Sequence, residues 1–365
     1  MTSSLPTAAA WTPSGRGAVA TIRVRGNLAT LSEGIAGIFQ AASGYLLEET
    51  LPQRISFGRW GRVEVGSGSP VAEDVVVCVT DSKTCEIHCH GGDAAVRRIV
   101  SDLKCLGCEI VDWRSQFETE RGVWEREHAD TLARATTLRA AGWIAVQAGR
   151  MERAIAELTE LVAGGQRELA TSRTHEMLAW ADFGLHLTRP WEVVLAGRPN
   201  VGKSSLINAL VGFERSIVFD EPGTTRDVVT ADTVLDGWAI RLSDTAGQRG
   251  AANSLEAAGI AKACEAFANA DARLLLIDVS QPPHDDDRRL LAEWPDAIVV
   301  AHKADLPDVW GESLPPNAIR VSSLQRTGLT ELSAAIVFRF VPALPGAETP
   351  IPLTTRQQSE LLAFL

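Results

Sequence analysis

The stretch Gly197-Arg198-Pro199-Asn200-Val201-Gly202-Lys203-Ser204-Ser205 has the G-x-x-x-x-G-K-S spacing of a phosphate-binding loop. In such a loop the glycines let the backbone turn tightly, so that successive N–H groups point at the phosphates of a nucleotide. The apolar run at 192–196 predicts a buried strand before the loop, and the run at 205–210 opens a helix after it. The phosphates would therefore lie at a helix N-terminus, with Lys203 on the β- and γ-phosphates and Ser204 on Mg²⁺.

Two motifs after this loop are typical of a GTPase. Gly223-Thr224-Thr225-Arg226-Asp227 lies in the loop before the next strand, where a threonine can complete the Mg²⁺ shell and sense the γ-phosphate. Asp244-Thr245-Ala246-Gly247 ends a strand, so that its aspartate can hold Mg²⁺ through water and the Gly247 N–H can reach the γ-phosphate. The second motif alone is weak evidence for a GTPase, but its position after the phosphate-binding loop makes that evidence strong.

A third motif, His302-Lys303-Ala304-Asp305, follows an apolar strand at the place where a GTPase recognises its base. A carboxylate at Asp305 can accept both N–H groups on the edge of guanine, which adenine does not offer, and the Lys303 stem can pack over the base. His302 stands where an asparagine is usual, which changes or removes one contact with guanine. Ser322-Ser323, after the last strand, can supply the remaining contact. Together the motifs predict a guanine-nucleotide site.

The rest of the chain can be divided around this nucleotide-binding domain. Residues 190–341 alternate strands and helices, which predicts a P-loop GTPase domain with a doubly wound, mostly parallel sheet. Residues 116–189 carry amphipathic helices and predict a helical domain, whereas residues 1–115 predict a compact α+β domain. A proline-rich linker and a helical stub follow at 342–365. The predicted strands, with one helix at 93–106, lie at 18–25, 74–79, 84–90, 191–196, 240–244, 273–278, 297–301 and 319–321. The predicted fold class is therefore α/β.

Length and composition are those of a globular protein with two or three domains. The chain has 365 residues, of which 45% are hydrophobic and 22% are charged. Its net charge of −11 argues against broad binding to nucleic acid, so any RNA contact would be local or supplied by a partner. No apolar run approaches the roughly 20 residues that span a bilayer, and residues 1–5 lack the features of a secretion signal. We expect a cytoplasmic protein that does not contact a membrane.

Four of the six cysteines are close enough in sequence to suggest a zinc site. They are Cys85, Cys89, Cys105 and Cys108, with His88 between the first two and His90 directly after Cys89. A strand at 84–90, however, sends Cys85 and Cys89 to one face and the histidines to the other, while Cys105 and Cys108 lie at a helix end and the turn after it. Buried thiols are therefore the favoured interpretation.

The motif set resembles one family closely, the tRNA-modification GTPases called MnmE or TrmE. Three motifs are similar to those of that family: G-R-P-N-x-G-K-S-S, G-T-T-R-D, and D-T-A-G followed by Leu255-Glu256-x-x-Gly259-Ile260. So are the runs Thr12-Pro13-Ser14-Gly15-Arg16-Gly17 with Ile22-Arg23-Val24, and Glu86-Ile87-His88-Cys89-His90-Gly91-Gly92. The resemblance covers residues 8–106 and 190–345 well and the helical middle poorly.

The resemblance implies a GTPase that depends on Mg²⁺ and K⁺. Its K⁺ would be held by Asn200, by the backbone of Phe219 and Glu221, and near Thr224, where a cation neutralises charge between the β- and γ-phosphates. Mg²⁺ would be held by Ser204 and Thr225. Glu256 would orient the attacking water and Lys203 would assist catalysis, while Gln248, directly after D-T-A-G, is the alternative water-positioning residue. The implied nucleotide-binding residues are Asn200, Val201, Gly202, Lys203, Ser204, Ser205, Phe219, Asp220, Glu221, Pro222, Gly223, Thr224, Thr225, Asp244, Thr245, Ala246, Gly247, His302, Lys303, Ala304, Asp305, Ser322 and Ser323.

The resemblance also assigns the N-terminal domain to dimerisation and to a 5-formyltetrahydrofolate one-carbon donor. Arg23 and Glu86 match two of the family's folate-binding positions. The third position, a lysine in the family, aligns with Glu127 and so has the opposite charge.

The implied role is modification of the tRNA wobble uridine, U34, to a carboxymethylaminomethyl form, by a homodimer working with an MnmG-type flavoprotein. The family's second helical half and its C-x-G-K tail have no counterpart before Leu365, which suggests a short member or a partner chain that carries the missing groups. Two alternatives are a degenerate GTP-binding regulatory module without modification activity and an RNA- or ribosome-assembly GTPase.

Overall fold

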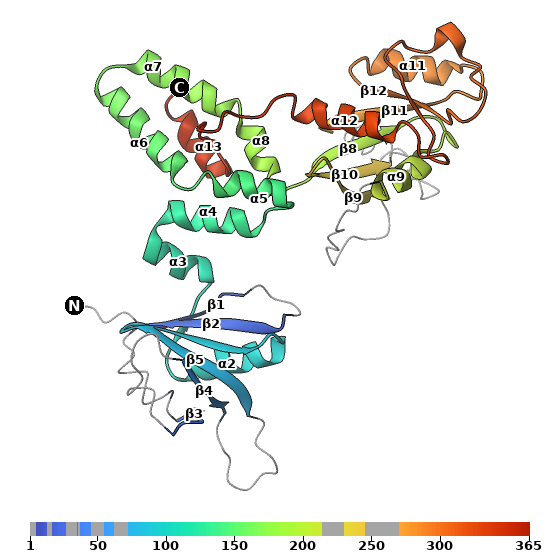
Figure 1. Cartoon of the computed structure of the whole chain (residues 1–365). Helices are drawn as coiled ribbons and strands as arrows, with labels where there is room; N and C mark the ends of the chain where they lie inside the picture. The colour runs from blue at the N-terminus through green and yellow to red at the C-terminus, as the bar shows by residue number, and fades with distance from the viewer. Residues whose placement is uncertain are drawn as a thin grey trace, which may run out of the picture. The chain divides into compact units, whose positions relative to one another are not determined.

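The computed structural model describes residues 5–12, 17–26, 35, 37–44, 55–61, 72–213, 230–244 and 270–365. Its contacts divide the chain into two units, Met1–Arg126 and Glu127–Leu365 (Figure 1). The predicted domain boundaries at 115, 189 and 341 are finer than this division and stay a prediction. Within the described ranges, no helix is both long and apolar enough to cross a membrane.

The first unit is built on a seven-stranded sheet with the order β3-β4-β5-β6-β2-β1-β7. Every neighbouring pair is antiparallel except β1 and β7, which are parallel. The strands are β1 (Thr7–Ala10), β2 (Val19–Arg25), β3 (Phe39–Ala41), β4 (Ile55–Trp60), β5 (Glu73–Asp81), β6 (Thr84–His90) and β7 (Glu109–Ile110). The strands predicted at 18–25, 74–79 and 84–90 are thus confirmed, because each alternates buried and less buried positions along one face of the sheet.

Helix α2 (Asp93–Cys105) covers the apolar face of this sheet, and its buried Ile99 and Leu103 join the core with Ile22 and Ile87 of the strands. The helix matches the prediction at 93–106. Helices α3 (Trp113–Arg121) and α4 (Val123–Ala133) follow it in the chain.

The cysteines divide between the core and the surface. Cys85, Cys89 and Cys108 are buried, and burial raises the pKa of Cys85 to about 12 and the pKa values of the other two thiols to about 11. The expectation of a buried thiol is wrong for Cys105, which ends α2 and is exposed. In the part of the chain that the structure describes, no group of three or more His, Cys, Asp or Glu side chains could hold a metal ion.

The second unit contains a helical part whose helices come from both sides of the nucleotide-binding domain in the sequence. These helices are α5 (Leu138–Ala145), α6 (Arg150–Ala163), α7 (Arg167–Leu178), α8 (Ala181–His186) and, at the end of the chain, α13 (Thr355–Leu362). Figure 1 shows α13 beside α6 and α7, and both helices contact it. The predicted helical stub is therefore a packed helix, whose buried Gln357 and Leu361 face its neighbours.

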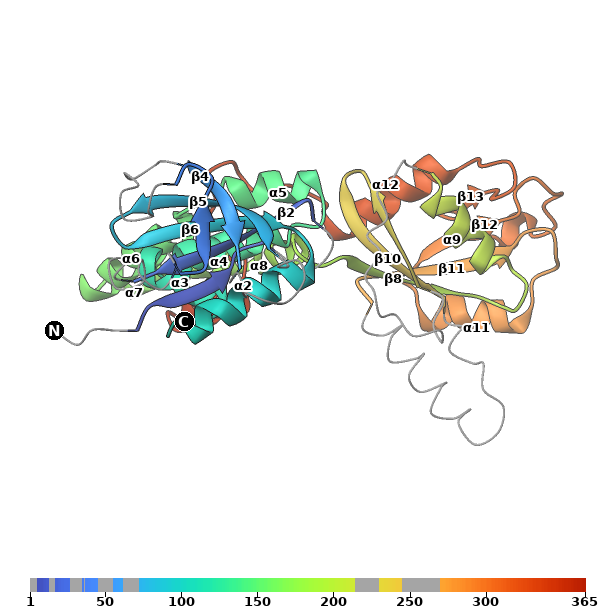
Figure 2. The same cartoon turned by 90° about the horizontal axis from the view of Figure 1, so that it is seen from below.

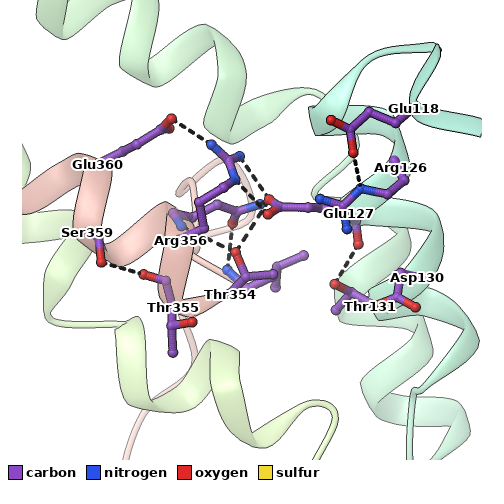
Figure 3. A network of polar contacts seen from close by, with 12 residues as sticks. Glu118, Arg126, Glu127, Asp130, Thr131, Thr354, Thr355, Arg356, Ser359 and Glu360 are labelled. Atoms are coloured by element: carbon purple, nitrogen blue, oxygen red, sulfur yellow. Dashed lines mark hydrogen bonds and ion pairs between the residues drawn. The ribbon is translucent and has the colours of Figure 1, made fainter. Parts of the chain in front are cut away.

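A buried carboxylate holds the α13 segment in place (Figure 3). Glu127 of α4 is only 5% exposed, and Arg356 donates to both of its oxygens, from Nε at 2.6 Å and from Nη2 at 2.8 Å. Gln357 Nε2 donates to Glu127 Oε2 at 3.2 Å, and Thr354 Oγ1 lies 3.4 Å from the same oxygen. Because the two-pronged contact and its added hydrogen bonds satisfy the charge, the carboxylate is stable in this buried position.

Replacing Arg356 by Met is expected to destabilise the protein by about 3 kcal/mol, because it leaves the Glu127 carboxylate buried without its main partner. The loss can be measured by urea denaturation of the full chain followed by far-UV ellipticity. Arg173→Met is the matched control, since Arg173 and Glu157 form an exposed pair at 3.4 Å between α7 and α6. That variant should lose less than about 1 kcal/mol. Equal losses in the two variants would contradict a structural role for the Glu127–Arg356 pair.

The nucleotide-binding part of the second unit has a six-stranded sheet with the order β13-β12-β11-β8-β10-β9. All neighbours are parallel except the hairpin of β9 and β10. The strands are β8 (Trp191–Ala196), β9 (Thr230–Leu235), β10 (Trp238–Asp244), β11 (Ala272–Asp278), β12 (Ile298–His302) and β13 (Ile319–Val321). The five strands predicted for this domain are confirmed. Strand β9 was not predicted, because its sequence Thr-Ala-Asp-Thr-Val-Leu is half polar, as suits an edge strand.

Helices cover both faces of this sheet (Figure 2). Residues of α9 (Lys203–Val211) and α12 (Leu329–Phe340) share one core with Val193 and Leu195 of β8. The alternate residues of β8, Val194 and Ala196, pack on the opposite face with Leu290 of α11 (Asp285–Glu293). The fold is therefore a doubly wound α/β sheet, as predicted, and ligands of such sheets bind outside the carboxyl ends of the strands.

Candidate nucleotide-binding site

The phosphate-binding loop connects the end of β8 to the start of α9. Its conformation requires glycine at both motif positions, since Gly197 has φ +146° and Gly202 has φ +103°. A Cβ at Gly197 would also lie 2.6 Å from the Leu276 carbonyl oxygen, too close for any side chain. Lys203 Nζ donates to the carbonyls of Gly197 and Arg198, each at 3.1 Å, so the buried ammonium lies across the loop. The sequence motif thus folds into a loop whose charge and helix N-terminus suit an anion.

Two oxygen-bearing side chains meet beside the start of α9. Ser204 Oγ lies 3.5 Å from Asp244 Oδ2, at the limit of a hydrogen bond, and Asp244 is buried where β10 ends. A hydroxyl and a carboxylate are the hard oxygen ligands that Mg²⁺ takes in proteins, so this pair suits Mg²⁺ bound directly or through water.

Lys303 connects the loop to the end of β11. Its Nζ donates to the Asn200 carbonyl at 3.1 Å and to Asp278 Oδ2 at 2.6 Å. Burial alone would raise the pKa of Asp278, but hydrogen bonds from Lys303 and Ser280 outweigh it and lower that pKa. Sequence analysis missed Asp278; its only signal was a polar residue at the end of a predicted strand. A cavity of about 240 Å³ opens beside these residues.

The loop has a second attachment through Arg198, whose Nη1 lies 3.4 Å from Asp287 Oδ2. Asp287 is only 5% exposed. It also accepts a hydrogen bond from the His284 backbone N–H, which is part of the capping box at the N-terminus of α11. This contact was not predicted, because it joins residues nearly ninety positions apart.

The residues predicted to recognise guanine lie at the carboxyl ends of β12 and β13. His302 is buried; its Nδ1 lies 2.8 Å from the Val201 carbonyl oxygen and its Nε2 lies 2.7 Å from Ser323 Oγ. Ser322 Oγ donates to Asp305 Oδ1 at 2.6 Å. The structure therefore brings together the loop, the His302–Asp305 motif and both serines, as their order along a parallel sheet predicts.

Comparisons with known proteins identify relatives of this chain. A family model described as 50S ribosome-binding GTPase matches residues 192–303. The tRNA modification GTPase MnmE of Moorella thermoacetica is 29% identical over 97% of this chain and 86% of that protein. The tRNA modification GTPase MnmE of Synechococcus sp. (strain CC9311) is 32% identical over 96% of this chain and 83% of that protein. This chain belongs to the MnmE family. Among solved structures, the G domain of the T. maritima FeoB iron transporter is 27% identical, with a TM-score of 0.31, over 41% of this chain and 99% of that one.

Several residues to which the family resemblance assigns a role in nucleotide binding or catalysis lie outside the described residues. They include Glu256 and the alternative Gln248, so the choice of the water-positioning residue stays a prediction. The others are Phe219, Asp220, Glu221, Pro222, Gly223, Thr224, Thr225, Thr245, Ala246 and Gly247.

In the N-terminal unit, the two residues matched to folate binding pair with each other. Arg23 donates to Glu86 Oε1 from Nη2 at 2.8 Å and from Nε at 3.1 Å, and its Nη1 lies 3.3 Å from Glu120 Oε2. The guanidinium also stacks on Trp11, 3.8 Å from the ring centroid. Arg23, Trp11 and Glu120 line a cavity of about 470 Å³.

His302 should make the stability of this MnmE family member depend on pH. Burial lowers its pKa below the ordinary value of about 6.5, although the hydrogen bond to Val201 partly offsets this shift. The unfolded chain therefore binds this proton more readily, and stability is lost as the pH falls below about 6.5. The melting temperature of the wild-type protein should fall more steeply between pH 7.5 and pH 5.5 than that of His302→Asn, which does not titrate. Parallel decreases would contradict this assignment.

Proposed function

We propose that this MnmE family member binds GTP with Mg²⁺ and hydrolyses it to GDP and phosphate. One observation carries the proposal: Lys203 and Ser204 at the start of α9, Asp244 at the end of β10 and Asp305 after β12 lie along one edge of the parallel sheet. These side chains offer a cation for the phosphates, oxygen ligands for Mg²⁺ and a carboxylate for the N–H groups of guanine. Family membership supports the same activity.

The proposed chemistry is in-line attack of water on the γ-phosphate. Lys203 neutralises the β- and γ-phosphate oxygens, and Ser204 and Thr225 hold Mg²⁺ with Asp244 in support. Mg²⁺, when bound, would neutralise negative charge on the β- and γ-phosphates. Glu256 orients the attacking water, with Gln248 as the alternative.

We propose K⁺ as the second ion, at Asn200 and the Phe219–Thr224 loop. Asn200 suits this role because it is exposed at the tip of the loop and has φ +62°, a conformation that its own carbonyl contact with Lys303 stabilises. The side-chain amide oxygen is then the protein ligand that Asn200 offers. Two copies of the domain would meet across this loop in a homodimer.

The proposed biological role is tRNA wobble-uridine modification in the cytoplasm, with an MnmG-type flavoprotein and tRNA as partners. The net charge of −11 supports a division of labour in which the partner supplies most of the contact with tRNA.

Folate does not fit the described residues in the way the family pattern implies. Arg23 and Glu86 neutralise each other, and the third position, Glu127, is an acid whose oxygens are taken by Arg356. A ligand carboxylate at Arg23 would have to displace both Glu86 and Glu120. We therefore assign no step to a one-carbon donor.

GTP turnover should be severalfold faster in K⁺ than in Na⁺ at equal ionic strength, because K⁺ at Asn200 stabilises charge that develops in the transition state. Asn200→Ala should remove this difference while nucleotide still binds. Asn208→Ala is the matched control, since Asn208 is an exposed asparagine on the same helix–loop unit, and it should keep the K⁺ stimulation. Equal wild-type rates in K⁺ and Na⁺ would refute the proposed ion mechanism.

Deleting the gene should remove the modification from the wobble uridine, as read by mass spectrometry of total tRNA. The wild-type gene should restore it, and a Lys203→Ala gene should not, because turnover requires the phosphate-binding lysine. An unchanged wobble uridine in the deletion strain rejects the tRNA role. Bound GTP without any turnover would instead favour the regulatory-module alternative.

A further inference from the structure

The side chain that replaces the usual asparagine is enclosed on several sides. His302 is 3% exposed, with Val201 O at 2.8 Å from Nδ1 and Ser323 Oγ at 2.7 Å from Nε2. The ring also packs against the phosphate-binding loop, since a Cβ at Gly202 would lie 2.4 Å from its Cε1. These contacts leave the imidazole one orientation.

The partners of His302 also determine which nitrogen carries the proton. A carbonyl oxygen only accepts, so Nδ1 must donate its N–H to Val201. In a neutral imidazole, Nε2 is then an acceptor, and the hydroxyl of Ser323 donates to it. The neutral ring has one donor and one acceptor, and this arrangement uses both.

An asparagine in the same place would behave differently. Its amide has two N–H donors and one carbonyl acceptor. After donating one N–H to Val201, it would keep the other N–H for a ligand. The neutral imidazole of His302 keeps none, so this position offers no donor to a bound base.

Guanine presents different chemistry on its two edges. One edge carries N–H donors, and the other carries the N7 and O6 acceptors. Asp305 accepts from Ser322 on Oδ1 at 2.6 Å and has further acceptor capacity for the donor edge. The acceptor edge of guanine would face His302, which has no free N–H donor.

We propose that this site recognises guanine through the Asp305 edge and makes no hydrogen bond from position 302 to N7, so that guanine nucleotides lacking N7 bind as well as GTP. The inference rests on the proposed function, GTP binding at this site. His302 is thus a specificity-determining residue that widens the range of accepted purines.

The test compares GTP with 7-deaza-GTP, in which a C–H group replaces N7. Dissociation constants are measured by calorimetry on the full chain with Mg²⁺ present. The wild-type protein should bind the two nucleotides within twofold of each other. His302→Asn should bind GTP about threefold to tenfold more tightly than 7-deaza-GTP, the range that one added hydrogen bond produces.

Inosine triphosphate, which lacks the 2-amino group, tests recognition by Asp305 separately from the missing hydrogen bond to N7. Weaker binding of this nucleotide than of GTP supports recognition by Asp305. Failure to bind any of the three nucleotides refutes the proposed function and this inference with it. Tight GTP binding with at least threefold weaker binding of 7-deaza-GTP to the wild-type protein overturns this inference alone.

The histidine itself provides a second measurement that does not depend on the variant folding. In ¹⁵N-labelled protein, the His302 ring should show a protonated Nδ1 and an unprotonated Nε2 at pH 7.5. The opposite tautomer would leave an unprotonated Nδ1 facing the Val201 carbonyl, and it would overturn the proton assignment on which the proposal rests.

Discussion

The conformation of the phosphate-binding loop depends on hydrogen-bond donors for the backbone carbonyls that point away from the phosphate site. A loop that points its N–H groups at an anion leaves its carbonyl oxygens on the other side, where burial without a partner is unfavourable. Here the carbonyl of Val201 is satisfied by His302 and that of Asn200 by Lys303. Both donors come from the end of β12, so the segment that supports the loop is also the segment that is proposed to read the base.

The same arrangement explains how a histidine is accepted at a position where GTPases usually have asparagine. The loop requires one hydrogen-bond donor from residue 302, and the Ser323 hydroxyl requires one acceptor. A neutral imidazole supplies both. Supporting the loop and contacting the base are therefore separable roles of this position. The chain retains the first role through a different side chain.

Glu127 shows a similar reassignment in the helical part of the second unit. We predict from the resemblance that Glu127 stands at the position of a family lysine, and an acid there would be unfavourable if it stayed buried and unpaired. Arg356, more than two hundred residues later, compensates its charge and brings α13 against α6 and α7. The substitution thus has a structural role that its alignment with a ligand-binding position does not suggest.

Much of the fold follows from local patterns. Strands β8, β11 and β12 are apolar runs because both of their faces are buried, and the motifs that follow them mark the carboxyl edge of the sheet. Strand β9, half polar and at the edge, carries no such signal. The exposure of Cys105 was also missed, because a helix end in contact with solvent has the same sequence pattern as one that is covered.

The sequence by itself determined the phosphate-binding loop, the positions of the parallel strands along the chain and the family, because each depends on residues close together in the chain. Only the tertiary structure decided the contacts of Glu127 with Arg356 and Gln357, of Asp287 with Arg198 and of His302 with Val201, because these partners lie about ninety to two hundred and thirty residues apart in the chain. Long-range pairs of this kind leave no periodic signal. Their geometry depends on how the sheet and helices pack.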